Sequence, residues 1–393
     1  MQESNFYLGE LKNFPQQMTD SIETPCFVVN EGLLRNNLEV LSTVKKRTGA
    51  KVLLALKAFA MHSTFPLISR YLDGVCASGP IEAQLGYEKF RKEVHTYSPA
   101  YSSEDIKKAV KYSDTIIFNS ISQWEKYRTT IKKSKKRIEV GLRVNPGWSE
   151  VETDLYNPVI PGSRLGVLPK DLEGQDLTGI DGLHFHALCE QNSDVLTRVL
   201  KSFEKSYGKY IKQMKWINFG GGHHITRKDY DVELLIKTIN DFKKKYKVQV
   251  HIEPGEAVAL NAGVLVSTVL DVVHNGVDIA ILDTSAEAHM PDVLAQPYRP
   301  NIIGAGKLGE QKYAYRLGGM TCLAGDIIGD YSFAKRLKPG DRLVFLDMAH
   351  YSMVKTTTFN GVRHPSIALH NPDTGKTMII KRFGYRTYAD RLS

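Results

Sequence analysis

The sequence predicts a (β/α)8 barrel with a second, β-rich domain, of sandwich or barrel-like form, and three observations support this. Short apolar segments alternate with amphipathic helical segments at a spacing of roughly 25 to 30 residues. Eight such segments precede Glu253, which is the number that closes a barrel. After Glu253, apolar segments are joined by Gly, Pro and Asp turns with little helical periodicity. A doubly wound open sheet is the alternative, but its glycine-rich phosphate turn near the start is absent from this sequence.

The elements follow in a regular order along the chain. A strand at 25–29 precedes a helix at 31–48, in which apolar residues recur at helical spacing. We expect the barrel to span residues 30–262. Its predicted strands are Val52–Leu56, Gly74–Ala77, Glu93–Ser98, Thr115–Asn119, Glu139–Val144, Gly182–His186, Trp216–Phe219 and Val248–Glu253.

The second domain is predicted to combine residues 1–29 with 263–393, so that the strand at 25–29 joins it. Its other expected strands are Gly263–Val273, Ile279–Asp283, Arg342–Met348 and Thr377–Arg382.

Composition narrows the class of protein. The chain has 393 residues, of which 42% are hydrophobic and 24% charged, values typical of a globular protein. No apolar run is long enough to span a membrane, and the first residues lack a secretory pattern, so we expect a cytoplasmic protein. The four cysteines lie far apart without a C-x-x-C pair, which argues against a zinc ribbon or a disulfide framework.

The net charge of +9 invites a nucleic-acid partner, but the distribution of the charge argues against one. The basic residues form short clusters at 45–47, 132–137 and 243–245, where predicted helices end. Cations are favourable at helix C-termini, and no aromatic residues are interleaved as a base-stacking surface requires. We therefore predict no nucleic-acid site.

One lysine at the end of the first barrel strand is a candidate nucleophile. Functional side chains of such barrels lie at the C-terminal strand ends, and Lys57 follows an apolar run there. Desolvation at this position would lower the pKa of the amine and allow it to attack a carbonyl carbon. The alternative is a lysine that merely extends into water.

Other strand ends supply partners for such an amine. His186, Gly220–Gly222 and Glu253 follow the sixth, seventh and eighth strands. Together they offer a flat ring, backbone N–H groups and a carboxylate, the groups that bind pyridoxal phosphate. Each residue also has a simpler interpretation: the glycines serve a tight turn, and Glu253 pairs with a barrel arginine. His184 and His186 resemble alternate metal ligands, but only His223 and His224 offer further ligands, so we predict no metal.

Several ordered motifs together resemble the fold-type III pyridoxal-phosphate decarboxylases, which include ornithine, arginine and diaminopimelate decarboxylases. The resemblance covers nearly the whole chain. The matching motifs are ALKA at 55–58, HFHA at 184–187, FGGG at 219–222, EPGE at 253–256, TCLAGD at 321–326, LDMAHY at 346–351 and FNG at 359–361.

The resemblance implies a role for each matching residue. Lys57 forms the imine link to the cofactor, His186 stacks on its ring, and Glu253 keeps the pyridine nitrogen protonated. The phosphate contacts are implied at Gly221, Gly222 and Tyr351. Cys322 protonates the carbanion after carbon dioxide leaves, and it comes from the second subunit of a homodimer with shared active sites.

Departures from the wider family indicate the substrate. Glu256 stands where ornithine and diaminopimelate decarboxylases usually have arginine, and Leu323 stands where they have an acid. Glu256 favours a cation over an anion, and Asp292 offers a compensating acid. With AHMPDV at 288–293, this pattern most resembles the carboxynorspermidine/carboxyspermidine decarboxylase branch, whose substrates are polyamines with one amino-acid head.

Three alternatives stay open. In the simplest interpretation, Glu256 and Asp292 are solvent-exposed charges that bind no ligand. A meso-diaminopimelate decarboxylase, or another basic amino-acid decarboxylase, is the second enzyme hypothesis, although Glu256 and Leu323 suit a second carboxylate badly. The third is a catalytically silent regulator, against which the presence of both Lys57 and Cys322 argues.

Overall fold

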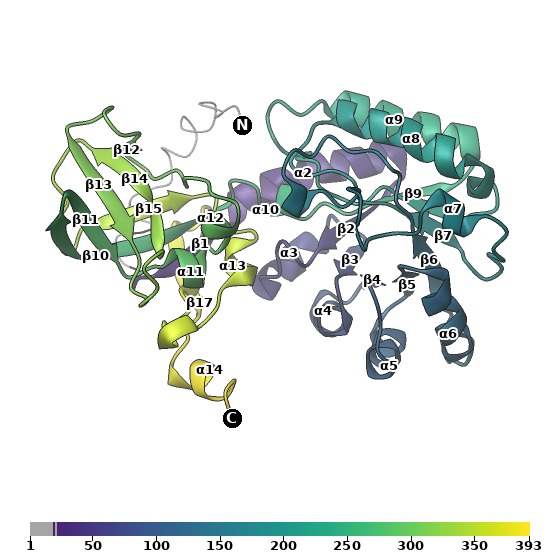
Figure 1. The fold of residues 1–393 in the computed structure, drawn as a ribbon, viewed down its shortest axis with the longest axis horizontal. Coiled ribbons are helices and arrows are strands. Elements are labelled where there is room, and N and C mark those ends of the chain that lie inside the picture. Colours follow the sequence, from purple (N-terminus) through teal and green to yellow (C-terminus); the bar gives the residue numbers. More distant parts are fainter. Residues whose placement is uncertain (1–18, 20–21) are drawn as a thin grey trace. The chain divides into compact units, whose positions relative to one another are not determined.

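The computed structural model describes Thr19 and residues 22–393, and it divides the chain into two compact units. The barrel unit comprises residues 35–258, and the sheet unit combines residues up to 34 with residues 259–393. The expected boundaries lay at 30 and 262, within a few residues of these. Figure 1 shows helices around the strands of one unit and a helix-poor arrangement of strands in the other.

Eight parallel strands close the barrel in sequence order. Each pairs with its neighbour, and the last pairs with the first. This confirms the predicted fold class. The strands are β2 (Lys51–Ala55), β3 (Gly74–Ala77), β4 (Glu93–Tyr97), β5 (Thr115–Phe118), β6 (Glu139–Arg143), β7 (Gly182–His184), β8 (Trp216–Asn218) and β9 (Gln249–Ile252).

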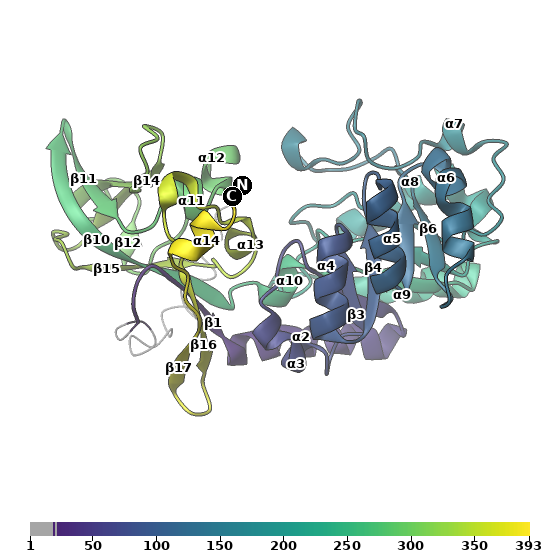
Figure 2. The same ribbon diagram turned by 90° about the horizontal axis from the view of Figure 1, so that it is seen from below.

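Helices follow most of these strands and cover the outside of the barrel (Figure 2). Serine caps the N-termini of two of them: Ser102 forms a capping box with Asp105, and Ser120 accepts from the Gln123 amide. The helices are α2 (Glu31–Thr48), α3 (Phe65–Ile68), α4 (Pro80–Leu85), α5 (Ser103–Tyr112), α6 (Ile121–Lys132), α7 (Pro169–Leu172), α8 (Ser193–Ile211), α9 (Val232–Tyr246) and α10 (Glu256–Ala259).

The basic clusters lie where the sequence placed them. Lys45, Lys46 and Arg47 form the last turn of α2, and the residues 243–245 form the last turn of α9. They therefore complement the negative ends of two helix dipoles. No helix in the described part of the chain combines the length and the apolar character needed to cross a membrane.

A large side chain on one strand packs against glycines on neighbouring strands in the barrel interior. Trp216 of β8 lies against Gly141 of β6 and Gly182 of β7, and a Cβ atom at Gly182 would come within 2.1 Å of the indole. The Trp216 ring also stacks on His251 of β9, with ring centroids 5.0 Å apart. Glycine on two strands thus makes room for one tryptophan on the next.

Most observed barrel strands end one or two residues earlier than predicted. β2 ends at Ala55 rather than Leu56, and β7 ends at His184 rather than His186. Only β3 ends at the predicted residue. The candidate site residues therefore lie just beyond the hydrogen-bonded ladders, in the loops that the strands position.

The sheet unit contains nine strands, of which the sequence predicted five. Their spatial order is β12-β14-β13-β11-β10-β1-β16-β17, and β15 also pairs with β10. Most pairs are antiparallel, but β1–β16 and β11–β13 are parallel. The strands are β1 (Cys26–Asn30), β10 (Gly263–Asn275), β11 (Val277–Leu282), β12 (Ala305–Gly306), β13 (Tyr313–Gly318), β14 (Ile327–Phe333), β15 (Arg342–Leu346), β16 (Ser366–Asn371) and β17 (Lys376–Lys381).

The long strand β10 organises this unit. Its first half pairs with β1 and β15, and its second half pairs with β11 beyond an irregularity between Val269 and Asp271. One buried hydrophobic cluster of this unit includes Phe27, Leu265 and Phe345. Short helices lie between the strands at α11 (Ala286–His289), α12 (Asp292–Ala295) and α13 (Ser352–Lys355), and α14 (Tyr385–Ala389) follows the last strand.

Candidate active site

Lys57 lies in a turn directly after β2. The turn is fixed by its backbone, because Ala55 donates to the Pro254 carbonyl at 3.0 Å and Leu56 to the Cys76 carbonyl at 3.0 Å. The Lys57 side chain itself is exposed, unlike its neighbours Leu56 and Ala58. The expectation of an amine buried on several sides is therefore wrong for this chain.

The loop after β8 requires glycine for steric reasons. A Cβ atom at Gly220 would come within 2.4 Å of the Phe185 carbonyl oxygen, and one at Gly222 within 1.9 Å of the Leu188 carbonyl oxygen. Gly220 and Gly222 also adopt positive φ values of 70° and 86°. Any side chain here would displace the loop, so the segment remains bare backbone that an anionic group can approach closely.

His186 is oriented by this loop. The Gly221 amide donates to Nδ1 of His186 at 3.2 Å, which leaves the other ring nitrogen to carry the proton. Burial, together with the nearby Lys57 ammonium, lowers the pKa of His186 well below its usual value. The imidazole is consequently neutral at physiological pH, which suits stacking on a protonated heterocycle without charge repulsion.

Glu253 follows β9 and lies close to residues of β8 and β7. Asn218 of β8 donates from Nδ2 to Oε1 of Glu253 at 2.6 Å, and its own Oδ1 accepts from the Gly220 amide at 2.8 Å. Nε2 of His184 lies 3.6 Å from Oε2. Burial lowers the pKa of His184 to about 4, although the Glu253 carboxylate opposes this shift. One buried asparagine thus couples the carboxylate to the glycine loop.

Glu256 begins α10 and pairs with a histidine. Its Oε2 atom lies 3.0 Å from Nε2 of His224, in the segment after the glycine loop. Burial disfavours the charge on His224, but the Glu256 carboxylate outweighs this effect and raises the pKa of His224. Glu256 is therefore not an isolated surface charge, because it has a cationic partner in the barrel unit.

Glu82 is a further carboxylate near Lys57 that sequence reasoning missed. It accepts from the backbone amide of Ser78 at 2.7 Å, at the end of β3. Burial raises the pKa of Glu82, while the Ser78 hydrogen bond and the Lys57 charge act in the opposite direction. Asn218 was also missed, and its only sequence signal is a polar residue within the apolar run of β8.

Cys322 lies in the turn between β13 and β14 of the sheet unit. It is exposed, and its backbone amide donates to Oδ1 of Asn360 at 2.8 Å. None of the four cysteines forms a disulfide; Cys26 is buried and only Cys322 is exposed. The structure thus leaves one thiol accessible in the turn that the sequence marked.

Asp292 and Tyr351 lie beside the same lysine. Nζ of Lys355 is 2.6 Å from Oδ1 of Asp292 and 5.5 Å from the centre of the Tyr351 ring. Tyr351 has φ 44° and ψ −55°, a conformation that non-glycine residues rarely adopt. Such a backbone persists only where the surrounding structure imposes it, and it is found preferentially at functional sites.

The barrel unit therefore assembles Lys57, His186, Gly221, Gly222, Glu253 and Glu256 at one end of its strands. Cys322, Asp292 and Tyr351 all belong to the sheet unit. No group of three or more His, Cys, Asp or Glu residues suited to a metal ion occurs in the described residues.

The barrel residues fit a phosphorylated heterocyclic aldehyde. The bare glycine loop suits a phosphate, the neutral His186 ring suits stacking, and the oriented Glu253 carboxylate suits a protonated ring nitrogen. The family model of pyridoxal-dependent decarboxylases, described as their C-terminal sheet domain, matches residues 26–349. The chain belongs to this family.

Two decarboxylases are similar to this chain over almost their full length. A carboxynorspermidine/carboxyspermidine decarboxylase of Campylobacter jejuni is 46% identical over 95% of this chain and 99% of its own. A carboxyaminopropylagmatine decarboxylase of Synechocystis is 43% identical over 99% of this chain and 100% of its own.

A solved pyridoxal-dependent decarboxylase has the same fold. The crystal structure of C. jejuni carboxynorspermidine decarboxylase complexed with norspermidine superposes with a TM-score of 0.87. It covers 94% of this chain and 100% of its own, with 46% identity. The likeness to carboxynorspermidine/carboxyspermidine decarboxylases, predicted from the motifs, is confirmed.

Proposed function

We propose that this pyridoxal-phosphate-dependent decarboxylase converts carboxynorspermidine and carboxyspermidine to norspermidine and spermidine, in polyamine biosynthesis. The observation that carries the proposal is the Lys57–His186–Glu253 arrangement in a chain 46% identical to an enzyme of that name. A silent regulator would not need an oriented Glu253 together with an accessible lysine and thiol.

The barrel residues bind and orient the cofactor in this proposal. Bound pyridoxal phosphate supplies an acceptor for the electron pair that remains when carbon dioxide leaves. The Lys57 amine is the group that can bond to its aldehyde carbon. Glu253 holds a proton at the ring nitrogen, and Asn218 fixes the carboxylate in the orientation that this requires.

Phosphate binding is proposed at Gly221, Gly222 and Tyr351. The glycine loop is bare backbone, which allows close approach of its amides to phosphate oxygens. Tyr351 contributes a hydroxyl from a turn held in a rare conformation. In this structure Nδ1 of His186 accepts a hydrogen bond from the Gly221 amide, so the loop also orients the ring that would stack on the cofactor.

Cys322 is proposed to donate the proton that replaces the lost carboxylate. Its thiol is exposed in this chain, as a group that serves the active site of a partner subunit must be. We therefore infer a homodimer in which Cys322 of the partner subunit completes each site. No nucleic acid or membrane takes part, and we expect the enzyme in the cytoplasm.

Glu256 and Asp292 are proposed to receive the substrate amines. Both already face cations, His224 at 3.0 Å and Lys355 at 2.6 Å, so each carboxylate lies where a positive charge is stabilised. The amines of a polyamine substrate would share these carboxylates with His224 and Lys355 or displace the two side chains. Diaminopimelate brings a second carboxylate instead, which two acidic groups would repel.

A second candidate substrate is carboxyaminopropylagmatine. The Synechocystis relative that carries this name is 43% identical over 99% of this chain. That substrate ends in a guanidinium rather than an amine, and both cations suit acidic residues such as Glu256 and Asp292.

Carbon dioxide release from purified protein loaded with pyridoxal phosphate tests these alternatives. The substrates compared are carboxynorspermidine, carboxyspermidine, carboxyaminopropylagmatine, meso-diaminopimelate, ornithine and arginine. We expect the highest kcat/KM with one of the two carboxylated triamines. Fastest turnover of diaminopimelate would overturn the assignment based on Glu256 and Leu323. A protein that shows no absorbance from bound cofactor would overturn the enzyme proposal as a whole.

A further inference from the structure

The turn that carries Cys322 is held by two side chains from outside it. Residues 322–325 are exposed and lie between β13 and β14, so they receive little support from packing. Asp326, the residue that follows this segment, accepts a hydrogen bond from Thr321, and Asn360 accepts one from the Cys322 amide. A reactive group on an exposed turn needs such support, because misplacement by about 1 Å can cost about 10²-fold in rate.

Asp326 ties this turn to the segment after β11. It is only 3% exposed, and its carboxylate accepts from Thr321 Oγ1 at 2.7 Å and the Thr321 amide at 3.1 Å. It also accepts from Ser285 Oγ at 2.9 Å and the Glu287 amide at 3.2 Å. A Cβ atom at Gly319 would come within 2.3 Å of the carboxylate. A buried carboxylate with several donors is a rigid junction between segments.

Asn360 fixes the turn at Cys322 itself. Its Oδ1 atom accepts from the Cys322 amide at 2.8 Å, across 38 residues of sequence. Asn360 adopts φ 55° and ψ 17°, a left-handed conformation that asparagine tolerates better than most residues. The bond restrains the Cys322 backbone and therefore the direction in which its thiol projects.

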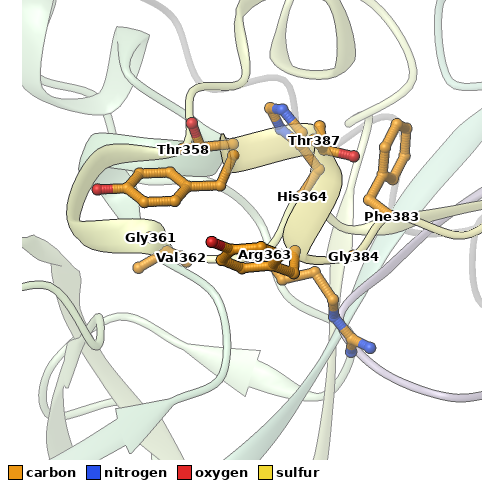
Figure 3. A pocket seen from close by; sticks show the side chains of 10 residues that line it. Thr358, Gly361, Val362, Arg363, His364, Phe383, Gly384 and Thr387 are labelled. Carbon is orange, nitrogen blue, oxygen red and sulfur yellow. The ribbon is translucent and has the colours of Figure 1, made fainter. Parts of the chain in front are cut away.

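The segment around Asn360 is anchored in turn by buried contacts. The Thr357 amide donates to the Ala288 carbonyl at 2.8 Å, and Nε2 of His289 lies 3.1 Å from the Arg363 carbonyl oxygen. Thr358 and residues 361–364 also line a cavity of about 140 Å³ with residues 383–385, 387 and 388 of the C-terminal segment (Figure 3). In this view His364 and Phe383 lie side by side, with ring centroids 5.1 Å apart.

We propose that Asn360 and Asp326 are positioning residues that hold the Cys322 turn so that the thiol delivers its proton to the substrate carbon. This inference rests on the proposed role of Cys322 as the acid. When the thiol is misplaced, the electron pair left by carbon dioxide takes its proton at the cofactor carbon instead. Water then releases an aldehyde product and leaves the cofactor as its amine, pyridoxamine phosphate.

The decisive variant is Asn360→Gly. Glycine adopts the left-handed conformation freely, so the backbone is retained while the acceptor for the Cys322 amide is removed. Asn360→Asp keeps an acceptor and serves as the conservative variant. Asn261→Gly is the matched control, because Asn261 also has a positive φ of 54° and lies elsewhere in the sheet unit.

The main readout is the ratio of pyridoxamine phosphate to amine product, measured by chromatography after turnover of the loaded enzyme. We expect Asn360→Gly to raise this ratio about tenfold or more. Asn360→Asp should stay closer to the wild type, and Asn261→Gly should not change the ratio. Asp326→Asn should also raise the ratio, and a folded Asp326→Asn variant with the wild-type ratio would refute the positioning role of Asp326.

A second readout does not depend on turnover. Hydrogen–deuterium exchange at the Cys322 amide should accelerate about tenfold or more in Asn360→Gly, because a restrained amide loses its acceptor. The Cys322→Ala variant distinguishes a failure of the proposed proton donor from a failure of the proposed positioning residues. If this variant keeps wild-type turnover and product ratio, the role of Cys322 fails. If it misprotonates while Asn360→Gly retains the wild-type ratio, only the positioning role is refuted.

Discussion

The two units hold their functional groups in different ways. In the barrel unit, Glu253, Asn218 and the Gly220 amide form a continuous chain of short hydrogen bonds between adjacent strand ends. In the sheet unit, Cys322 lies on an exposed turn, and Asp292 lies on a four-residue helix. The first arrangement is preorganised by a regular ladder, whereas the second depends on individual side chains that bridge segments distant in sequence.

This difference suggests a division of labour. Most groups proposed for the cofactor lie directly after barrel strands, and Tyr351 of the sheet unit is the exception. Most groups proposed for the proton and the substrate lie on a turn or a short helix of the sheet unit. Loops tolerate substitution better than the elements they connect, so the same cofactor chemistry can serve different substrates. Glu256 is an intermediate case, because it lies in the barrel unit but is proposed to bind substrate.

The largest expected effect is from Lys57→Ala in the barrel unit. Without the amine that bonds to the cofactor aldehyde, kcat should fall on the order of 10⁴-fold. The absorbance of the bound cofactor should change as well, which a spectrum of the purified protein measures. Lys237→Ala on the exposed face of α9 is the matched control. Unchanged activity of Lys57→Ala would contradict the assignment of this lysine.

Glu253→Gln should have the next largest effect. The amide can still contact Asn218 but no longer keeps a proton on the ring nitrogen, so kcat should fall about 10²- to 10³-fold. Asn218→Ala leaves the carboxylate but removes its orienting partner, and it should cost about tenfold. Steady-state kinetics of both variants checks this order. An Asn218→Ala variant as impaired as Glu253→Gln would indicate that orientation rather than charge dominates.

Substitutions of the proposed substrate acids should act mainly on KM. Glu256→Gln and Asp292→Asn should each raise KM for carboxyspermidine about tenfold or more, because a hydrogen bond to a charged group contributes about 1.5–3 kcal/mol. His224→Gln is the control, since it keeps Glu256 but removes its partner. Equal effects of Glu256→Gln and His224→Gln on KM would mean that Glu256 supports His224 and does not bind substrate.

The smallest expected effect is on stability. The raised pKa of His224 means that folding favours its protonated form, so the pair with Glu256 stabilises the protein below the ordinary histidine pKa of 6.5. This stabilisation is lost as pH rises through the raised value. Glu256→Gln should therefore lower the free energy of unfolding by about 1–2 kcal/mol at pH 6 and by less at pH 9. Urea titrations at both pH values measure this difference, and a larger loss at pH 9 would contradict it.

Local patterns in the sequence predicted the barrel well. Each strand and helix there has its own periodicity, and the strand ends identified Lys57, His186 and Glu253 before any geometry was available. The burial expected for Lys57 was wrong, because exposure depends on how the loops beyond the strand fold. Asn218 was missed because a single polar residue in an apolar strand does not indicate which carboxylate it contacts.

The sheet unit was harder to predict because its pairing is non-local. β12, β13, β14 and β16 were missed: β12 is only two residues long, and β13 and β14 pair across a turn that contains two glycines. The bond between Cys322 and Asn360 spans 38 residues, and periodicity carries no information about such contacts. The residues proposed for the site in this unit were instead predicted from motifs shared with related decarboxylases.

A mixture of two complementary variants tests the division of labour most directly. Lys57→Ala and Cys322→Ala are each purified, mixed in equal amounts under conditions that allow subunits to exchange, and assayed for formation of the amine product from carboxyspermidine. If each active site combines Lys57 of one chain with Cys322 of its partner, about one quarter of the wild-type activity should return, because half of the dimers carry one intact site. Each variant treated alone controls for the exchange procedure. A mixture no more active than its two components, despite demonstrated exchange, would contradict the shared site.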